Sequence, residues 1–323
     1  MKTITIVYKG KEYAYPNSWE GLTPDTYLET VRLLQLIEQG RMSVGEARIR
    51  LFCKIAGWDL RRVHDEDTVS NLIVLSERLT FLFRIQYPDD NAALSTLTDE
   101  QYRQAVRREP DNIREPWALP LRQLDWHYQP DLCFFRQQLP TITVPDGSPS
   151  GKLTLCGYTA TCHHQALDTS LTALQYVEAL EAREQPTRLA AILYAPQPYN
   201  SSQAHALAAD MRLDDLTLHA IAINFDALNT FLFTKTEFSL LTKFEDSQKT
   251  RTITTTMLDG IYDLCADGLG NSSEVEQLNL LTYLRLMRKK TIDGVRQLSS
   301  AGMDVAKIAN ETHLPPDIIT SIL

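Results

Sequence analysis

The sequence feature that most constrains the fold is a helix-start pattern, Leu-Thr-x-x-x-Tyr, which occurs three times at spacings of about 75 residues. The copies lie at residues 22–27, 97–102 and 171–176. In the first copy Thr23 is placed to cap a helix, and Pro24 falls at the first helical position, where a missing N–H costs nothing. In the other two copies a glutamine stands at the third helical position, which predicts a capping box. The pattern predicts three helices that begin alike, and duplication stays an open question because the sequences after each copy diverge.

Apolar residues at helical spacing predict that the rest of the chain is also mainly helical. Helices are expected over residues 24–39, 43–57, 66–85, 172–184, 187–193, 214–234, 251–266 and 274–298. The segment 66–85 is apolar on several sides, so we expect it at the centre of the N-terminal core. Residues 3–7 and 12–15 are β-prone and predict a short hairpin. The expected fold class is mainly α, with multi-helix domains, this N-terminal hairpin and a small helix-turn-helix-like C-terminus.

Seven prolines between residues 110 and 149 forbid long helices in that region and predict a connector. The connector also contains large aromatic residues, which indicates that it packs against another part of the chain. Its last part, residues 145–151, has the composition of an exposed loop and marks a predicted domain boundary. The sequence thus predicts a hairpin plus helical domain over 1–108, the connector over 109–150, a second helical domain over 151–240 and a C-terminal helical region over 241–323.

The charge balance disfavours nucleic acid as a partner. The chain has 32 Lys and Arg residues against 41 Asp and Glu residues, a net charge of -9, and such a field repels a phosphate backbone. The first residues lack the apolar region of a signal peptide, and we expect no run of about 18 apolar residues that could span a bilayer. Five scattered cysteines suit reduced thiols. We therefore expect a cytoplasmic protein without a membrane partner.

The clustered soft ligands in the sequence are Cys156, Cys162, His163 and His164. A tetrahedral zinc site needs four such groups that converge on one point, and this spacing is not that of a zinc finger or ribbon. Successive side chains of a strand point to opposite faces, so the adjacent histidines do not readily bind one ion. The sequence therefore favours ordinary thiols and surface imidazoles, and we expect no metal.

The sequence contains no motif that identifies an enzyme. It lacks a Gly-x-Ser-x-Gly elbow, a His-Glu-x-x-His helix, a phosphate loop and a dinucleotide fingerprint. Any of five cysteines could be paired with several histidines as a nucleophile, so no one pair is favoured. Acidic residues at 65–67, 89–90 and 214–215 are interpreted as helix caps or first-turn charges. We expect no catalytic residue, no cofactor and no small-molecule ligand.

Residues 301–319 support an alternative function because they resemble a helix-turn-helix. The second helix of this segment carries no Lys or Arg, although such residues normally hold phosphates. One interpretation is a DNA-associated regulator, and the other is a helical corner packed against a neighbour. A basic run at residues 285–290 leaves two further interpretations open, a solvated helix face or a docking site for an acidic partner.

The segment 16–24, Pro-Asn-Ser-Trp-Glu-Gly-Leu-Thr-Pro, lies between the predicted hairpin and a leucine-rich helix. This opening resembles the start of uncharacterised proteins from phages and prophages of gut bacteria. In those proteins a segment similar to residues 188–196, Arg-Leu-Ala-Ala-Ile-Leu-Tyr-Ala-Pro, follows a capped helix. Their genes lie among tail genes, so the resemblance implies a tail assembly chaperone or a minor virion component. It covers about half of the chain, supplies no catalytic residues and leaves residues 241–323 unexplained.

We therefore expect a non-enzymatic, phage-derived virion assembly or structural protein that acts through contacts with other virion or tail proteins. Large aromatic side chains dominate interface energetics, and Trp117, Trp126 and Tyr128 in the connector are the candidate partner-binding residues. The alternative is that all three belong to the core. We expect the chain in the cytoplasm of the bacterial host, with incorporation into the virion left open.

Overall fold

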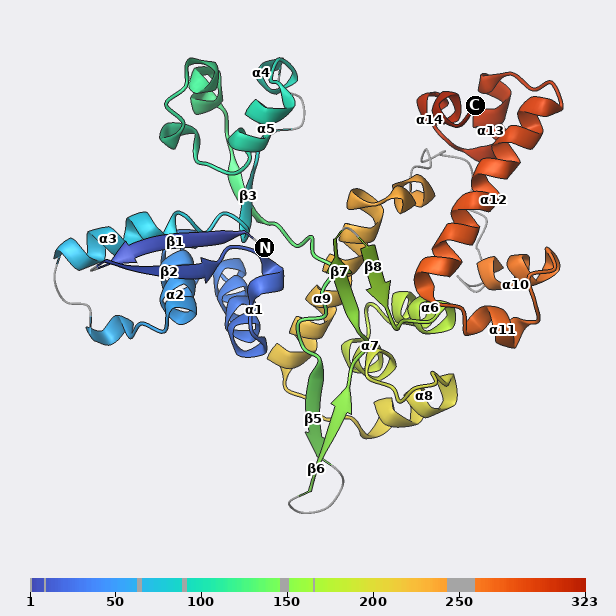
Figure 1. The fold of residues 1–323 in the computed structure, drawn as a ribbon, viewed down its shortest axis with the longest axis horizontal. Coiled ribbons are helices and arrows are strands. Elements are labelled where there is room, and N and C mark those ends of the chain that lie inside the picture. The colour runs from blue at the N-terminus through green and yellow to red at the C-terminus, as the bar shows by residue number, and fades with distance from the viewer. Residues whose placement is uncertain are drawn as a thin grey trace. The chain divides into compact units, whose positions relative to one another are not determined.

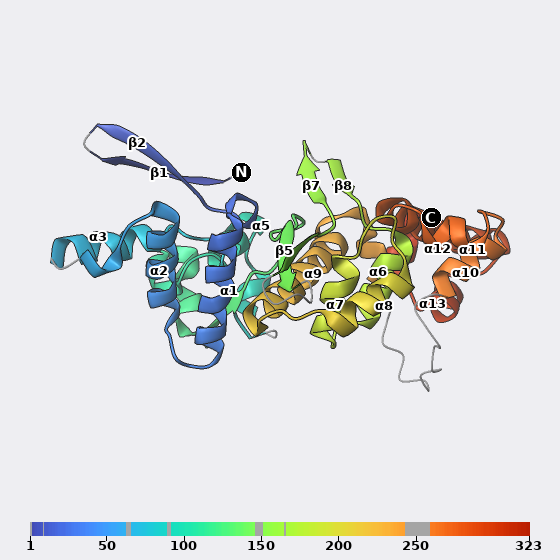
Figure 2. The ribbon, with the colours of Figure 1, turned by 90° about the horizontal axis from the view of Figure 1, so that it is seen from below.

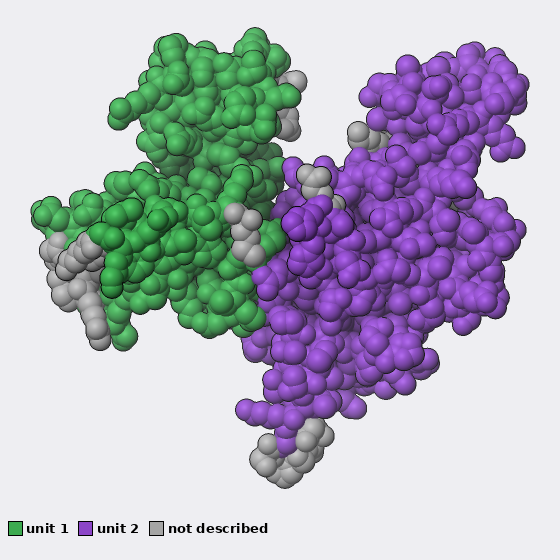
Figure 3. Space-filling model, viewed as in Figure 1, with its two compact units in different colours: residues 1–132 green, residues 133–323 purple. Residues whose placement is uncertain are grey.

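The chain divides into two compact units, Met1–Leu132 (unit 1) and Cys133–Leu323 (unit 2), which are coloured separately in Figure 3. The structure is a computed structural model that describes residues 2–8, 10–62, 66–88, 92–145, 151–164, 166–242 and 259–323. The division falls inside the predicted connector, which therefore contributes residues to both units. The predicted boundary at 145–151 joins two paired strands instead, and its residues 146–150 lie outside the described part of the chain.

Unit 1 consists of helices and two antiparallel strand pairs (Figure 1, blue to green). In chain order its elements are β1 (Thr3–Tyr8), β2 (Lys11–Pro16), η1 (Trp19–Gly21), α1 (Pro24–Glu38), α2 (Val44–Ala56), η2 (Leu60–Arg62), α3 (Glu66–Ser76), β3 (Phe83–Gln86), α4 (Ala92–Ser95), α5 (Asp99–Ala105), η3 (Pro110–Asn112), η4 (Pro116–Gln123) and β4 (His127–Pro130). Strand β1 pairs with β2, and β3 pairs with β4. The predicted hairpin and the helix starts at Pro24 and Ser43 are confirmed.

The three predicted helix starts are confirmed by their hydrogen bonds. The hydroxyls of Thr23, Thr98 and Thr172 each accept the N–H of the third helical residue, at 3.2, 3.3 and 3.2 Å. At Thr98 the glutamine side chain accepts the cap N–H at 2.9 Å, which completes the capping box. The predicted box at Thr172 is wrong, because Gln175 is buried and its side chain donates to the carbonyl of Ile192 at 2.8 Å. The core has redirected this side chain.

The cap at Thr23 gives a first testable prediction. Thr23 is exposed, so replacing it by alanine removes the capping hydroxyl and little packing. We expect T23A to lower the free energy of unfolding of unit 1 by about 1 kcal/mol. Urea denaturation followed by tryptophan fluorescence measures this change. T23S keeps the hydroxyl and serves as the control. Equal stability of T23A and T23S would contradict a stabilising role of the Thr23 cap.

Trp19 lies at the centre of the first part of unit 1. Its indole N–H donates to the carbonyl of Asp131 at 2.8 Å, and its ring meets those of Tyr27 and Phe81 edge to face, at 6.2 and 5.3 Å between centroids. The surrounding core comes mainly from α1 and α2, and its buried residues include Leu22, Tyr27, Val31, Leu33, Leu34, Ala47, Leu51 and Phe52. This tryptophan therefore joins the beginning of unit 1 to its last residues.

The hairpin β1–β2 is buried only at its inner half. Ile4 is buried, and the ring of Tyr15 packs edge to face on Phe52 at 5.7 Å. The outer half, with Val7 and Tyr13, is exposed and stands clear of α1 and α2 (Figure 2). The hairpin is thus attached to the helical core at one end.

The predicted helix over 66–85 is wrong in length and in placement. Helix α3 ends at Ser76, and Ile73 and Val74 on it are 43% and 56% exposed. The buried apolar residues farther along are in a loop and in β3, where Phe83 and Ile85 face inward. A run that is apolar at most positions fits a buried strand as well as a buried helix, so periodicity alone does not separate them.

Unit 2 adds two more hairpins and most of the helices (Figure 1, green to red). Its elements are β5 (Thr141–Pro145), β6 (Lys152–Cys156), β7 (Ala160–His163), β8 (Ala166–Thr169), α6 (Ala173–Glu181), α7 (Pro186–Leu193), α8 (Ser201–Asp210), α9 (Asp215–Lys235), η5 (Glu237–Thr242), α10 (Asp259–Ala266), α11 (Ser272–Glu276), α12 (Leu280–Ser300), α13 (Val305–Thr312) and α14 (Pro316–Ile322). Strands β5 and β6 pair, as do β7 and β8. The mainly α fold class is confirmed. The predicted helix over 274–298 is divided between α11 and α12, and residues 251–258 of another lie outside the described residues.

The first residues of unit 2 form an irregular segment that is held by α9. Phe134, Phe135 and Gln138 are buried. Asn224 on α9, only 1% exposed, accepts the N–H of Gln138 at 2.6 Å and donates to the carbonyl of Arg136 at 3.1 Å. A buried backbone without regular partners requires such side-chain bonds. Asn224 therefore makes hydrogen bonds with this backbone that a neighbouring strand would otherwise make.

Helix α9 is long and apolar enough, by length and composition, to cross a membrane. Its most apolar 18-residue window has a mean hydropathy of 1.3, and 39% of that window is buried. The expectation that no run of about 18 apolar residues spans a bilayer stays a prediction. Ile221, Phe225, Leu228 and Leu232 of this helix are buried in unit 2, as the core helix of a globular unit requires. We interpret α9 as that core helix.

Candidate partner-binding site

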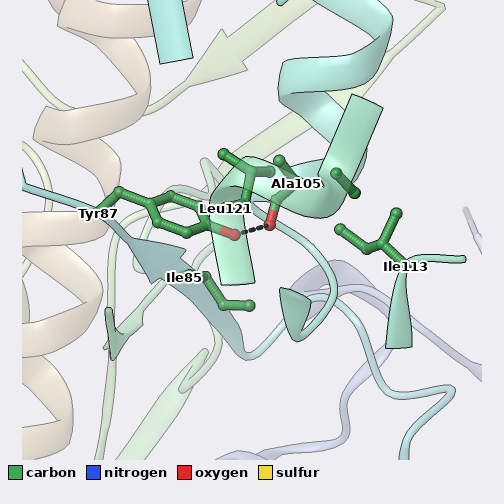
Figure 4. Close-up of a cluster of buried hydrophobic side chains, with 6 residues drawn as sticks. Ile85, Tyr87, Ala105, Ile113 and Leu121 are labelled. Carbon is green, nitrogen blue, oxygen red and sulfur yellow. Dashed lines mark hydrogen bonds between the residues drawn. The ribbon is translucent and has the colours of Figure 1, made fainter. Parts of the chain in front are cut away.

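The three aromatic residues singled out in the sequence pack against a buried cluster in unit 1. Figure 4 shows this cluster, which contains Ile85, Tyr87, Ala105, Ile113, Ala118 and Leu121. The hydroxyl of Tyr87 donates to the carbonyl of Ala105 at 3.3 Å. Trp117, Trp126 and Tyr128 are half-buried around the cluster. Each therefore has one face on the cluster and keeps part of its surface accessible.

Local structure explains how these rings are positioned. A proline at the first helical position starts η4, which carries Trp117. Tyr128 lies in β4 opposite Ile85 of β3, so strand pairing fixes its place. The ring of Trp126 meets that of Tyr128 edge to face at 5.1 Å between centroids, a favourable aromatic geometry. Trp117 is thus positioned by η4, whereas Tyr128, with Trp126 against it, is positioned by the second strand pair of unit 1.

Arg48 of α2 also lies against the Tyr128 ring. Its guanidinium carbon is 4.8 Å from the centroid of Tyr128 and 5.7 Å from that of Phe83, which are cation–π distances. Its Nη1 is 3.4 Å from the Tyr128 hydroxyl oxygen and 3.6 Å from Oε1 of Glu109. The Tyr128 hydroxyl also donates to the Glu109 carboxylate. Arginine, tyrosine and glutamate therefore form one connected group.

Arg48 is unusually buried for a charged side chain, with 11% of its side-chain surface exposed. Burial lowers the pKa of Arg48 from its ordinary value, and the carboxylates of Glu109 and Glu77 oppose that change. Arginine stays protonated even so. Its Nε is buried and has no hydrogen-bond partner among the residues that the structure describes. The guanidinium thus keeps one donor that the described chain does not use.

A pocket of about 640 Å³ opens beside this group, and we call it the Arg48 pocket. Its lining residues are Arg48, Val74, Glu77, Arg78, Thr80, Arg107, Arg108, Glu109 and Asn112. Four arginines and two glutamates give the lining an excess of positive charge, although the whole chain carries a net charge of -9. The pocket is therefore a local exception to an acidic protein.

The arginines of the pocket differ in the ion pairs and hydrogen bonds that they form within the protein. Arg107 pairs with Asp131 at 2.7 Å and donates to the carbonyl of Thr80 at 2.9 Å. Arg78 and Arg108 are exposed, and within the described ranges neither side chain forms an ion pair. A guanidinium offers a planar fork of donors that matches a carboxylate or a phosphate. The pocket can therefore bind an anion without breaking these internal bonds.

The other candidate ligands and acids do not gather into a site. Cys156, Cys162, His163 and His164 are exposed, and the described residues contain no group of three His, Cys, Asp or Glu side chains that could hold a metal. Asp214 caps α9 as predicted, because its carboxylate accepts the N–H and the hydroxyl of the third helical residue. These bonds lower its pKa below the ordinary value. Asp65 and the acids at 89–90 lie outside the described residues.

The C-terminal helices pack as the predicted helical corner. Helices α13 and α14 enclose a buried cluster with α12, made of Val295, Ile308, Leu314 and Ile319. The basic run on α12 faces acids of the same unit: Arg285 and Arg288 lie 3.9 and 3.5 Å from Glu237. Lys290 lies 3.5 and 2.8 Å from Asp263 and Asp267. These partners are consistent with an internal role for the run.

Comparison with known proteins adds no assignment to this geometry. No family model matches the sequence, and the searches of curated proteins and of solved structures found no match either. The pocket must therefore be interpreted from its own chemistry. Sequence reasoning missed its arginines, since Arg48, Arg78 and the pair 107–108 come from three separate segments.

Proposed function

We propose that this chain is a non-enzymatic, phage-derived assembly or structural protein of a virus particle that acts through protein–protein contacts. The observation that carries the proposal is that Trp117, Trp126 and Tyr128 stay partly accessible in unit 1, with Tyr128 stacked on Arg48 of a pocket. Tryptophan, tyrosine and arginine are the residues most enriched at the energetic centres of protein interfaces. This combination supports unit 1 as the part that binds a partner.

The viral part of the proposal is supported by the sequence resemblance. Residues 16–24 and 188–196 resemble segments of phage and prophage proteins whose genes lie among tail genes. The partners are then other virion or tail proteins. The chain acts in the cytoplasm of the bacterial host, either as a tail assembly chaperone or as a minor component that stays in the virion.

The contacts around Tyr128 support the side chains that we propose to bind a partner. Trp126 and Arg48 both contact the Tyr128 ring, and the aromatic residues pack against the buried cluster. Such support fixes the rotamers before a partner arrives. Pre-ordered side chains lose less conformational entropy on binding, so each contact contributes more of its energy to affinity.

A capture experiment tests the proposal with a matched tryptophan control. We expect a tagged full-length chain to capture a co-expressed product of a neighbouring tail gene, and the double variant W117A/W126A to reduce that capture at least about tenfold. W58A is the control because Trp58 is 42% exposed in unit 1 but belongs to neither the cluster nor the pocket. Circular dichroism verifies that each variant is folded. Equal capture by the double variant and by W58A would contradict the assignment of the anchors.

A further inference from the structure

We infer that the Arg48 pocket binds carboxylates and that its natural occupant is an acidic segment of a protein partner. The identity of the partner rests on the proposed function. The chemistry of the pocket does not, because it follows from the residues that line it. None of its lining residues was among the candidate site residues of the sequence, and the pocket lies beside the aromatic anchors rather than among them.

The lining of the pocket carries an excess of positive charge. Arg78 and Arg108 are exposed and, in the described part of the chain, unpaired, whereas Arg107 is engaged by Asp131. Two guanidinium groups are therefore free to bind an anion that enters. In a chain with a net charge of -9, this concentration of positive charge draws an acidic segment to one place on the surface.

Arg48 also contributes to the pocket. Its Nε is buried without an acceptor among the described residues, and a buried donor left unpaired is unfavourable. Arg48 lines the pocket, so its guanidinium places positive charge beside an incoming carboxylate. Stacking on Tyr128 and Phe83 already orders the guanidinium, so binding does not have to fix a mobile side chain.

Glu109 shows which anion the pocket accommodates. Its carboxylate lies in the lining, 3.6 Å from Nη1 of Arg48, and it accepts the hydroxyl of Tyr128. It is thus an internal example of a carboxylate held between an arginine and a tyrosine. A carboxylate from outside would find the same kind of donors in the unpaired Arg78 and Arg108.

The surroundings favour a peptide over a nucleic acid. The arginines are confined to a pocket instead of following an extended phosphate backbone. Val74 also lines the pocket and is 56% exposed, which provides contact for an apolar residue next to the acidic ones. Acidic and apolar side chains on one segment match this lining.

The test uses the full-length chain and a fluorescein-labelled hexapeptide of five glutamates and one leucine. Fluorescence anisotropy in about 50 mM salt, where charge interactions act over longer distances, measures the Kd. We expect saturable binding, and we expect R78Q/R108Q to raise the Kd about tenfold or more. R114Q removes an exposed arginine of unit 1 outside the pocket and is expected to leave the Kd within about twofold.

Three outcomes would overturn the inference. They are no saturable binding by the wild-type chain, an equal Kd for R78Q/R108Q and R114Q, and tighter arginine-dependent binding of a single-stranded hexanucleotide than of the peptide. A peptide with glutamine in place of glutamate must lose affinity if charge drives binding. If R78Q/R108Q loses the acidic peptide but still captures the tail protein, the carboxylate site stands and the proposed partner binds elsewhere.

Discussion

Replacing Trp19 by alanine is expected to lower the free energy of unfolding of unit 1 by about 3–5 kcal/mol. The side chain is 3% exposed and its ring packs on those of Tyr27 and Phe81. Its indole N–H also donates to the carbonyl of Asp131, so the substitution opens a cavity and leaves that carbonyl without its donor. The loss combines packing with a contact between the two ends of the unit.

All four tryptophans of the chain belong to unit 1, which makes the measurement specific. Urea denaturation of W19A is followed by the fluorescence of the other three. W58A is the matched control, because Trp58 is 42% exposed and its ring meets that of Phe52 edge to face. We expect it to lose only about 1 kcal/mol. A loss for W19A no larger than that for W58A would contradict the central position of Trp19.

Replacing Asn224 by leucine is expected to lower the free energy of unfolding of unit 2 by about 2–4 kcal/mol. The asparagine accepts the N–H of Gln138 and donates to the carbonyl of Arg136, and leucine makes neither bond. The side chain of Gln138 already has buried polar atoms without partners in the described part of the structure. A further unpaired backbone group in the same place should release the segment from α9.

The change in unit 2 is separable from unit 1 by comparing two signals. Far-UV circular dichroism follows helix in both units, whereas tryptophan fluorescence follows unit 1 alone, so N224L should shift only the dichroism transition. T230A changes an exposed residue of the same helix, and we expect its stability to stay within about 0.5 kcal/mol of the wild type. A shift of the fluorescence transition by N224L would contradict the prediction, because the destabilisation would then include unit 1.

Local signals in the sequence predicted the starts of helices well, and longer-range contacts decided the rest. Thr98 completes its capping box because its glutamine is free to turn back. Gln175 stands at the same position after Thr172, but the core uses its side chain elsewhere. The apolar run after residue 76 became β3 because β4, some forty residues later, was available to pair with it. Neither the bond of the Gln175 side chain nor the formation of β3 could be predicted from the residues next to it in the sequence.

The candidate site could be predicted only in part for the same reason. Tyr128 was selected as an exposed aromatic, but its stacking on Arg48 depends on how α2 and β4 meet in the fold. The local signal for the pocket was the pair of arginines at 107–108, which resembles any solvated charge pair. Burial of Arg48 and the position of Glu109 emerge from packing. A site assembled from three segments has no spacing to search for.

The bond between Trp19 and Asp131 also has a consequence for synthesis on the ribosome. The two residues are separated by 112 positions. At about 5–20 residues per second, the indole of a nascent chain waits roughly 5–20 s before its acceptor has been polymerised. Throughout that interval the aromatic core around Trp19 lacks its final contact, while the residues that complete it are still being added. Unit 1 therefore closes late in its own translation, and slower decoding before residue 131 would prolong the exposure of its core.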